Sequence, residues 1–361
     1  MLQDLNQKQV STIKMPLDLP DSIRAAQESA LKNLGVSLSE STKLAEAVMM
    51  LSAFYVKNPE KSSPWHEVWA QIAYLAYYMP LNWWRLCGVV SRGQQLNFFN
   101  GFEHYIDFGS GLGSLGFAFD ESQLSFISGT CVETAKQAIN LHRGLADQSL
   151  TPLVWNQGST PEEIKPNTLA AFSYSFTELE KLPDWVSDCD GLLIVEPSTQ
   201  EDSRRLQTLR GELLTQGWHV WGPCTHAEPC PLLVLSDRDW CHDRFQWTQP
   251  AWLKQIENKM PIKNGTLPCS WLMMRRDPPA IADKPQKLDL GRMTGDLLEY
   301  KGFSKQLMCR GRAREFVSWQ RRDFKKNTPE IGRGDLVRIS QGLDVKGNEV
   351  RPKFFEDIVK I

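Results

Sequence analysis

Residues 105–113 read Tyr-Ile-Asp-Phe-Gly-Ser-Gly-Leu-Gly, an apolar strand-like run that ends in three alternating glycines. Glycines let a chain turn sharply and bring its backbone close to a ligand at the carboxyl end of the first strand of an α/β sheet. Glu133 follows at the end of the next strand candidate, where a carboxylate can accept hydrogen bonds from both hydroxyls of a ribose. The pattern predicts a nucleoside-binding edge, although such glycines also occur in structural turns that bind no ligand.

Short apolar segments alternate with segments of helical period after this turn. The strand candidates are 104–108, 124–132, 153–155, 169–176, 192–195, 219–221 and 270–274. Helical spacing covers 135–145 and 206–213, and the second helix is opened by a capping box at 199–202 and closed by Gly217. Strands that alternate with helices predict an α/β fold with a doubly wound, mostly parallel sheet.

The regions on either side of this α/β segment have different patterns. Residues 1–100 show mostly helical spacing, and Pro80 is expected to end one helix. A Pro- and Lys-containing linker at 277–287 leads into a small β-rich extension, in which 336–339 is the best strand. The expected domains are 1–100, 101–280 with a cysteine-bearing insertion at 222–262, and 281–361 with its basic residues.

Three cysteines lie within eighteen residues of an irregular, proline-interrupted segment, and a fourth lies far downstream. This set is Cys224, Cys230, Cys241 and Cys309. Without a secretory signal, neighbouring thiols predict soft-metal ligands in a reducing compartment rather than disulfides. Zinc would accept four thiolates, or three with His226 or His242, whereas a cubane iron–sulfur cluster would accept four thiolates. The spacing favours neither group, unligated thiols remain an alternative, and the other four cysteines are expected in the core.

Basic residues concentrate near the end of a chain that is otherwise almost neutral. The whole sequence has 41 basic and 43 acidic residues, a formal net charge of −2. Residues 301–326 contain Glu315, Asp323 and nine basic residues, an excess of seven: Lys301, Lys305, Arg310, Arg312, Arg314, Arg321, Arg322, Lys325 and Lys326. This excess predicts a surface for nucleic-acid phosphates, although a solvated basic face has the same composition.

The sequence predicts neither a membrane span nor secretion. The most apolar stretch, at 73–90, is interrupted by Pro80, Asn82 and Arg85. The N-terminal segment contains an acidic residue and lacks the apolar core of a signal peptide. Because no leader rich in Arg and Ser is evident, we expect a bacterial cytoplasmic protein, with the mitochondrial matrix as the alternative. We also expect a monomer.

Several motifs together carry a family resemblance. They are Ala-Tyr at 73–74, Met-Pro at 79–80, Asp-Phe-Gly-Ser-Gly at 107–111, Ser-Tyr at 173–174, Glu-Leu at 178–179, Val-Glu-Pro at 195–197, the four-cysteine pattern, and Gly-Asp at 334–335. In this order they resemble the methyltransferase-like proteins of the mitochondrial small ribosomal subunit, which have bacterial relatives. The Asp-x-Gly-x-Gly-x-Gly spacing also resembles motif I of class I S-adenosylmethionine-dependent methyltransferases more than the Gly-x-Gly-x-x-Gly of nicotinamide enzymes.

The resemblance implies a class I methyltransferase fold with a mostly parallel seven-stranded sheet, together with a cofactor site and a metal site. The residues implied at the S-adenosylmethionine site are Asp107, Gly109, Ser110, Gly111, Gly113, Glu133, Ser173 and Tyr174. The ligands implied for a 4Fe–4S cluster, with zinc as the alternative, are Cys224, Cys230, Cys241 and Cys309. The implied partners are small-subunit rRNA and the assembling subunit, met by Arg310, Arg312, Arg314, Arg321 and Arg322.

The sequence does not identify a catalytic residue with the same clarity. The segment after the fourth strand reads Ser-Tyr-Ser-Phe at 173–176, without the Asn/Asp-Pro-Pro motif usual in enzymes that methylate exocyclic base nitrogens. Glu178 is the one candidate base, although an acid that opens a helix is often only a cap. Three functions therefore stay open: an rRNA methyltransferase, a non-catalytic ribosome assembly factor, and a zinc-stabilised methyltransferase of a non-RNA substrate.

Overall fold

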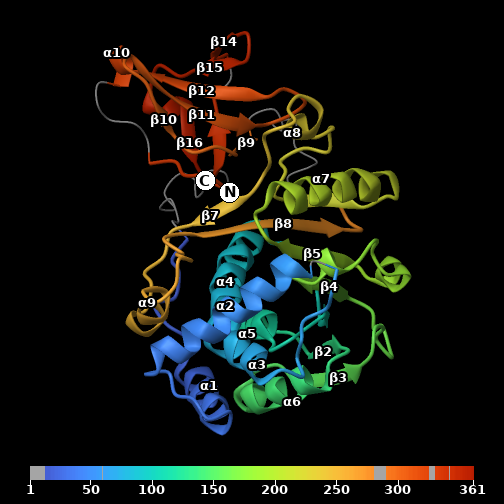
Figure 1. Ribbon diagram of the computed structural model, residues 1–361. Coiled ribbons are helices and arrows are strands. Elements are labelled where there is room, and N and C mark those ends of the chain that lie inside the picture. The colour runs from blue at the N-terminus through green and yellow to red at the C-terminus, as the bar shows by residue number, and fades with distance from the viewer. Residues whose placement is uncertain (1–12, 59, 280–289, 325–329, 341) are drawn as a thin grey trace. The chain divides into compact units, whose positions relative to one another are not determined.

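The structure, a computed structural model, describes residues 13–58, 60–279, 290–324, 330–340 and 342–361 (Figure 1). The chain forms two compact units from discontinuous stretches. We call residues 15–196 with 245–267 the glycine-loop unit, and residues 1–14, 197–244 and 268–361 the cysteine unit. Most of the predicted linker (280–287), together with Lys325 and Lys326, lies outside the described residues.

Five parallel strands form the centre of the glycine-loop unit. They are β1 (His104–Phe108), β2 (Ser128–Glu133), β3 (Leu153–Gln157), β4 (Thr168–Ser173) and β5 (Gly191–Glu196). Their order is β3-β2-β1-β4-β5, and Asp107 of β1 lies opposite Cys131 of β2 and Ala171 of β4. Because the strands run in one direction, their carboxyl ends lie at one edge, which brings the glycine loop, Glu133 and Ser173 to the same side of the unit.

Helices account for most of the rest of this unit. They are α1 (Asp21–Asn33), α2 (Ser41–Lys57), α3 (Val68–Ala73), η2 (Tyr74–Tyr78), α4 (Met79–Gln95), α5 (Ser114–Glu121), α6 (Lys136–Leu145), η3 (Ala146–Gln148), η4 (Phe176–Glu178), η5 (Asp184–Asp188) and α9 (Ala251–Glu257). The expected helix end at Pro80 is wrong, because a π-helical turn, η2, leads directly into α4. Pro80 lies in the first turn of α4, and the residues before it are also helical, so the helical backbone continues through the proline by way of the π-helical turn.

The cysteine unit combines a helix, short strands and a second sheet. Its elements are α7 (Gln200–Thr215), β6 (His219–Gly222), α8 (Pro231–Val234), β7 (Asp243–Phe245), β8 (Leu267–Arg275), β9 (Leu290–Met293), β10 (Leu298–Glu299), β11 (Phe303–Cys309), β12 (Glu315–Gln320), α10 (Arg321–Phe324), β13 (Leu336–Ile339), β14 (Asp344–Lys346), β15 (Glu349–Arg351), η8 (Phe355–Asp357) and β16 (Ile358–Lys360). Strand β6 pairs antiparallel with β8. The predicted cap of α7 is confirmed, since the Thr199 side chain accepts a hydrogen bond from the Asp202 N–H.

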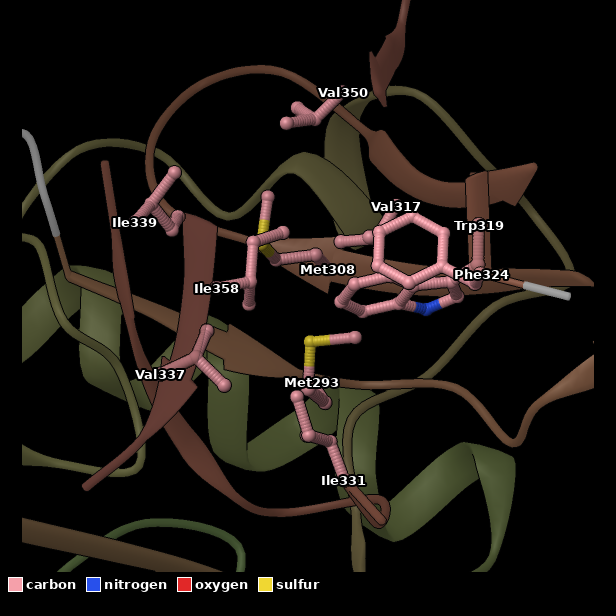
Figure 2. Close-up of a cluster of buried hydrophobic side chains, with 10 residues drawn as sticks. All are labelled: Met293, Met308, Val317, Trp319, Phe324, Ile331, Val337, Ile339, Val350 and Ile358. Carbon is pink, nitrogen blue, oxygen red and sulfur yellow. The ribbon is translucent and has the colours of Figure 1, made fainter. Parts of the chain in front are cut away.

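The β-rich extension is a sheet of order β14-β15-β12-β11-β9-β13-β16, with β10 added to β11. Its core consists of buried side chains from β9, β11, β12 and the later strands, among them Met293, Met308 and Trp319 (Figure 2). Sequence periodicity identified only β13 here, because most of these strands are short and only partly apolar. Strand β11 carries Cys309 at its end, so this core fixes the position of the most remote cysteine.

The α/β class, the mostly parallel sheet, the helical N-terminal region and the β-rich C-terminal region are confirmed. Two strands are shorter than expected: β2 begins only at Ser128, and β4 ends at Ser173 because Tyr174 turns into the left-handed region with φ 58°. None of the helices in the described ranges is both long and apolar enough to cross a membrane.

Candidate nucleoside site and thiol pocket

The glycine loop is confined by side chains from the neighbouring elements. Gly109 (φ +66°) and Gly113 (φ +81°) adopt left-handed conformations that favour glycine. A Cβ added at Gly109 would lie 2.6 Å from the Cβ of Ser175, and one added at Gly113 would lie 2.0 Å from Nε2 of His142. These two positions therefore require glycine both for their dihedral angles and for the space around them.

Acidic side chains gather around this loop. Asp107 is 2% exposed, and its Oδ1 has no hydrogen-bond partner among the described residues. Glu133 is also buried, and its two carboxylate oxygens accept hydrogen bonds from the backbone N–H groups of Gly111 (3.0 Å) and Ala135 (2.9 Å). Burial and the nearby charge of Glu133 raise the pKa of Asp107 to about 8. A buried carboxyl group that lacks a partner is costly, so the site is suited to a ligand that donates hydrogen bonds or carries positive charge.

Glu178 belongs to the same acidic group. Its side chain keeps contact with solvent, yet loss of water to the surrounding protein and the charge of Glu133 raise its pKa to about 7. The residues before it tie the strand ends together, since Ser175 Oγ donates to the Phe108 carbonyl at 2.6 Å and the Phe176 N–H donates to Glu196 Oε1 at 2.8 Å. The segment after β4 is thus a structural brace that leads to a carboxyl group able to titrate near neutral pH.

Aromatic residues from the helical region also reach the loop, and sequence reasoning missed them. The Trp65 ring lies 3.7 Å from the position of a Cβ on Gly111, and it stacks on Tyr74 with ring centroids 4.2 Å apart. Tyr74 shares hydrogen bonds with Ser63 Oγ (2.8 Å) and the hydroxyl of Tyr55. Burial chiefly, with a contribution from the Glu178 charge, raises the pKa of Tyr55. Nothing in the spacing of these residues connects them to a glycine loop that follows much later in the chain.

The four predicted cysteines line one pocket of the cysteine unit. Its empty volume is about 280 Å³, counting the part open to solvent, and its wall also contains Gln207, Thr225, Leu232, Arg292 and Thr294. All eight cysteines are free thiols. Burial and neighbouring thiols raise the pKa of Cys309, and burial raises that of Cys241 to about 11. The fold therefore brings the remote Cys309 to the same pocket as Cys224, Cys230 and Cys241.

The thiols are not arranged around a single ion. Within the described ranges, no group of three or more His, Cys, Asp or Glu side chains is placed to hold a metal ion. Of the two histidines considered as zinc ligands, His226 has its Nε2 3.2 Å from Cys309 Sγ, and His242 stacks on Trp240 with centroids 5.7 Å apart.

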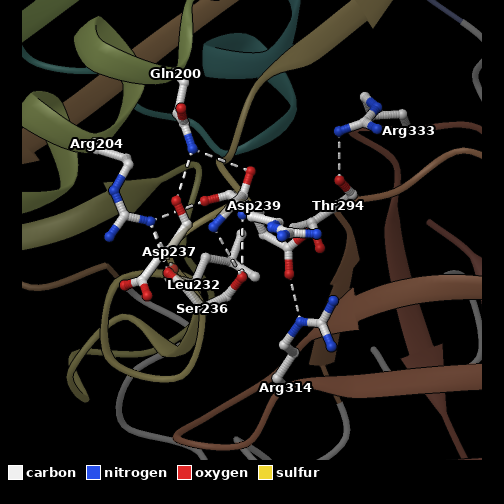
Figure 3. Close-up of polar contacts among 10 residues, drawn as sticks. Gln200, Arg204, Leu232, Ser236, Asp237, Asp239, Thr294, Arg314 and Arg333 are labelled. Atoms are coloured by element: carbon white, nitrogen blue, oxygen red, sulfur yellow. Dashed lines mark hydrogen bonds and ion pairs between the residues drawn. The ribbon is translucent and has the colours of Figure 1, made fainter.

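Helix α7 holds both loops that carry the first three cysteines. Arg204 donates to the carbonyl oxygens of Leu232 (3.0 Å), Ser236 (2.9 Å) and Asp239 (3.0 Å), and Figure 3 shows this side chain reaching the loop. One helical face therefore presents a row of polar side chains to the loops: Arg204, Gln207 and Arg210. The buried Arg210 donates to the carbonyls of residues 226 and 228, and Gln207 Oε1 lies 3.6 Å from Cys224 Sγ.

The arginines that follow Cys309 form ion pairs inside the cysteine unit. Arg310 binds Glu315 through two hydrogen bonds of 2.7 and 3.0 Å. Arg312 pairs with Glu228, and Arg314 pairs with Asp239, the latter visible in Figure 3. Arg321 and Arg322 lie in α10 instead: the guanidinium of Arg321 donates to the Lys301 carbonyl at 3.3 Å, and Arg322 pairs with Asp323 at 3.4 Å. The predicted basic surface is thus two groups with different surroundings.

Comparison with solved structures finds several methyltransferases that are similar to part of the chain. A Listeria monocytogenes protein described as a class I S-adenosylmethionine-dependent methyltransferase is 12% identical, with TM-score 0.38, over 72% of this chain and 90% of its own. A Pyrococcus horikoshii protein described as an RNA methyltransferase is 12% identical, with TM-score 0.35, over 53% and 83%. TrmK of M. capricolum, solved with S-adenosyl-homocysteine, is 8% identical, with TM-score 0.33, over 52% and 69%.

No curated protein matches the chain. The model of one protein family, described as "Mitochondrial small ribosomal subunit Rsm22", matches residues 69–255. This match runs from helix α3 through the glycine loop to the first three cysteines, and it covers more than half of the 361 residues. The chain belongs to the mitochondrial small ribosomal subunit Rsm22 family.

Proposed function

We propose that this protein binds S-adenosylmethionine at its glycine loop and acts on RNA of the small ribosomal subunit as a methyltransferase during subunit assembly. The observation that carries the proposal is the group of three carboxyl groups, Asp107, Glu133 and Glu178, around a loop of left-handed glycines. S-adenosylmethionine carries a sulfonium, an ammonium and two ribose hydroxyls, which suit an acidic site. The pyrophosphate of a nicotinamide cofactor would instead meet charges of its own sign.

The residues at the loop fit the parts of this ligand. The buried Asp107 has an oxygen with no partner among the described residues, so it can accept a donor from the ligand. Each Glu133 oxygen is oriented by a backbone N–H group, and Oε1 also accepts from Thr134 Oγ1 at 3.4 Å, so Oε2 is the oxygen that would accept from a ribose hydroxyl. Ser110, Ser173 and Tyr174 belong to the turns beside these two carboxylates, and their contact with the ligand is part of the proposal.

Bound there, S-adenosylmethionine would supply a methyl group that is activated by the positive sulfur. The protein's contribution to transfer would be to position the acceptor and to remove its proton. Glu178 suits the second task, because a pKa near 7 lets a carboxylate accept a proton at neutral pH. Trp65, which stacks on Tyr74, lies against the loop, where it would exclude water from the ligand.

The RNA partner and the compartment follow from the family and from charge. The family description names a mitochondrial small ribosomal subunit, which supports an association with that subunit and favours the mitochondrial alternative over the bacterial cytoplasm. Basic side chains of the cysteine unit would meet RNA phosphates, and among the described residues Arg321 forms no ion pair with an acidic side chain.

We further infer that Cys224, Cys230, Cys241 and Cys309 hold a 4Fe–4S cluster. Four thiols around one pocket are the ligand set that a cubane cluster needs. Tetrahedral zinc would instead draw its ligands to about 2.3 Å from one ion. The cluster would cross-link both α7-supported loops to strand β11, so its proposed role is structural rather than redox.

A non-catalytic assembly factor is the second candidate function, and one observation favours it. The segment after β4, where many nucleic-acid methyltransferases carry their target-base motif, is occupied with binding the ends of β1 and β5 through Ser175 and Phe176. Such a protein would use the methyltransferase fold and its cofactor as a binding platform only.

Calorimetry and a transfer assay test these proposals on anaerobically purified protein. We expect S-adenosylmethionine and S-adenosylhomocysteine to bind and NAD not to bind, with Asp107→Asn weakening the first two. Failure of both ligands to bind would overturn the cofactor proposal. Labelled methyl transfer to small-subunit RNA would establish the enzyme, whereas binding without transfer would favour the assembly factor. About four irons per chain would support the cluster, and about one zinc would replace it.

A further inference from the structure

We propose that the hairpin between β10 and β11, together with the start of α10, is a docking face for single-stranded RNA, with Tyr300 as the surface on which a base stacks. This inference rests on the proposed RNA partner and specifies which part of the cysteine unit meets it and in which form. Of the basic residues in this face, sequence reasoning had named Arg321 and Arg322 as RNA contacts, but it gave no role to the aromatic side chains beside them.

The aromatic platform is held rigidly at the surface. Tyr300 stacks on Phe303 with ring centroids 4.8 Å apart and an interplanar angle of 16°, and its backbone N–H donates to the Phe303 carbonyl at 2.9 Å. The Tyr300 residue is nevertheless 46% exposed. Since one ring face lies against Phe303, a base that stacks on Tyr300 would use the opposite face.

Cationic side chains lie next to this ring. Lys301 follows Tyr300 in the turn and is exposed. The backbone N–H of Arg321 donates to the Gly302 carbonyl at 3.0 Å, and its guanidinium donates to the Lys301 carbonyl at 3.3 Å, so the start of α10 is attached to the hairpin turn. Arg322 comes next and is 82% exposed, with Asp323 at 3.4 Å. The aromatic face and three positive charges therefore occupy one small surface.

Lys301 and Arg321 are more available than the arginines after Cys309. In the described part of the chain, no acidic side chain forms an ion pair with Lys301 or Arg321, whereas Arg312 and Arg314 each have a carboxylate partner on a cysteine loop. The hairpin contains a single acidic residue, Glu299, which lies on β10 opposite Ser304 rather than in the turn. The net charge of the turn and the start of α10 is therefore positive.

Single-stranded RNA is the partner that uses both features. Its phosphates meet the cations and its unpaired bases offer π faces for stacking, whereas a duplex keeps its base faces buried within the helix. An acidic peptide would use the charges but would leave the exposed face of Tyr300 without a matching group. Stacking on an aromatic side chain contributes about 1–3 kcal/mol per base, enough to dominate a surface with so few charges.

Fluorescence anisotropy with a labelled 12-nucleotide oligoadenylate and the full chain tests this face. We expect Tyr300→Ala to weaken binding by about 5- to 100-fold, as the loss of one stacked base implies, and Tyr300→Phe to stay within about twofold because the ring is kept. Lys301→Ala and Arg321→Ala should each reduce the salt slope by about 0.7. Arg338→Ala, an exposed position on β13, is the matched control and should leave the affinity unchanged.

The outcomes separate this inference from the proposed function. Wild-type protein that binds no RNA would overturn both. Wild-type binding that Tyr300→Ala leaves intact, in a variant with an unchanged melting temperature, would overturn the docking face alone. A duplex of equal length that binds as tightly as the single strand would also overturn it, as would displacement of the oligonucleotide by polyglutamate that is equally effective in wild type and Tyr300→Ala.

Discussion

Replacing Asp107 by Asn should make the protein more stable at neutral pH and weaken the proposed binding of S-adenosylmethionine. Asp107 is buried at the end of β1, and its pKa rises from an ordinary 3.8 to about 8, mainly through burial and then through the charge of Glu133. In the folded protein this carboxyl group therefore stays protonated at pH values where the unfolded chain has already released the proton. Stability is lost as pH rises from the unfolded pKa of 3.8 and stops falling above the folded pKa of about 8.

The magnitude follows from these two pKa values. A pH of 7 is about three units above the pKa of Asp107 in the unfolded chain. Because the folded protein keeps this proton, the free energy of unfolding falls by about 4 kcal/mol, at about 1.4 kcal/mol per unit. At pH 5 the same reasoning gives less than about 2 kcal/mol. An amide of the same shape has no charge to lose, so Asp107→Asn should gain more at pH 7 than at pH 5, by about 2–3 kcal/mol as an upper bound.

Urea denaturation at pH 5 and pH 7, followed by tryptophan fluorescence, measures this difference, and calorimetry measures the binding of S-adenosylmethionine. We expect Asn to weaken binding by about 10- to 100-fold, because it cannot ionise when the positively charged ligand binds and a hydrogen bond to a charged group contributes about 1.5–3 kcal/mol. A variant that is equally or less stable at pH 7, or whose stability difference does not change with pH, would refute the assignment of Asp107 as a strained ligand-binding carboxyl group.

Three further variants test other parts of the two sites. Gly113→Ala places a Cβ 2.0 Å from His142 Nε2 at φ +81° and should lower the free energy of unfolding in urea by at least about 1–2 kcal/mol. Gly144→Ala, with no atom within 4 Å, is the control and should be neutral or slightly stabilising. Equal effects of the two substitutions would contradict the requirement for glycine at position 113. If Glu178 accepts the proton, the methyl-transfer rate should rise with pH through about 7, where the carboxyl group ionises, and the Gln variant should be slow and flat; a wild-type rate that does not change between pH 6 and 8 would remove it from the reaction. Arg210→Lys keeps the charge but loses the fork that binds two loop carbonyls, so iron per chain should fall well below that of wild type; unchanged iron would mean that the loop forms without it.

Local sequence patterns predicted an element well where the residues that determine it lie within the element itself. β1 and β13 have the expected bounds, and the Thr199 cap opens α7, because apolar runs and caps act within a few residues of each other. The predicted helix end at Pro80 was wrong because the sequence does not show that a π-helical turn precedes the proline and continues into α4. Strand β2 was predicted four residues too early, because apolar residues in a loop look like strand.

The candidate sites were predictable only where one residue type carries the chemistry. Glycines, acidic residues and cysteines indicate a possible ligand site by their residue type and spacing. The glycine loop, Glu133 and the four-cysteine set could therefore be predicted as site candidates from the sequence. Their support could not, because it depends on contacts between distant segments: Trp65 against Gly111, and Arg204 and Arg210 against the cysteine loops. A buried polar row at spacing three along α7 is the one signal that could have identified these arginines.

Charge counting could not show which basic side chains form ion pairs within the protein, and this bears on how the protein would meet RNA. Nine positive charges in one segment suggested one continuous phosphate-binding face. Arg314 pairs with the half-buried Asp239 on a cysteine loop, and Arg310 pairs with the largely buried Glu315 at the start of β12. Binding RNA through these two arginines would first require breaking the ion pairs. Lys301 and Arg321 incur no such cost and stand beside an exposed aromatic ring. One basic run would thus serve two purposes: the arginines after Cys309 form ion pairs within the cysteine unit, and the cations around Tyr300 would face the nucleic acid.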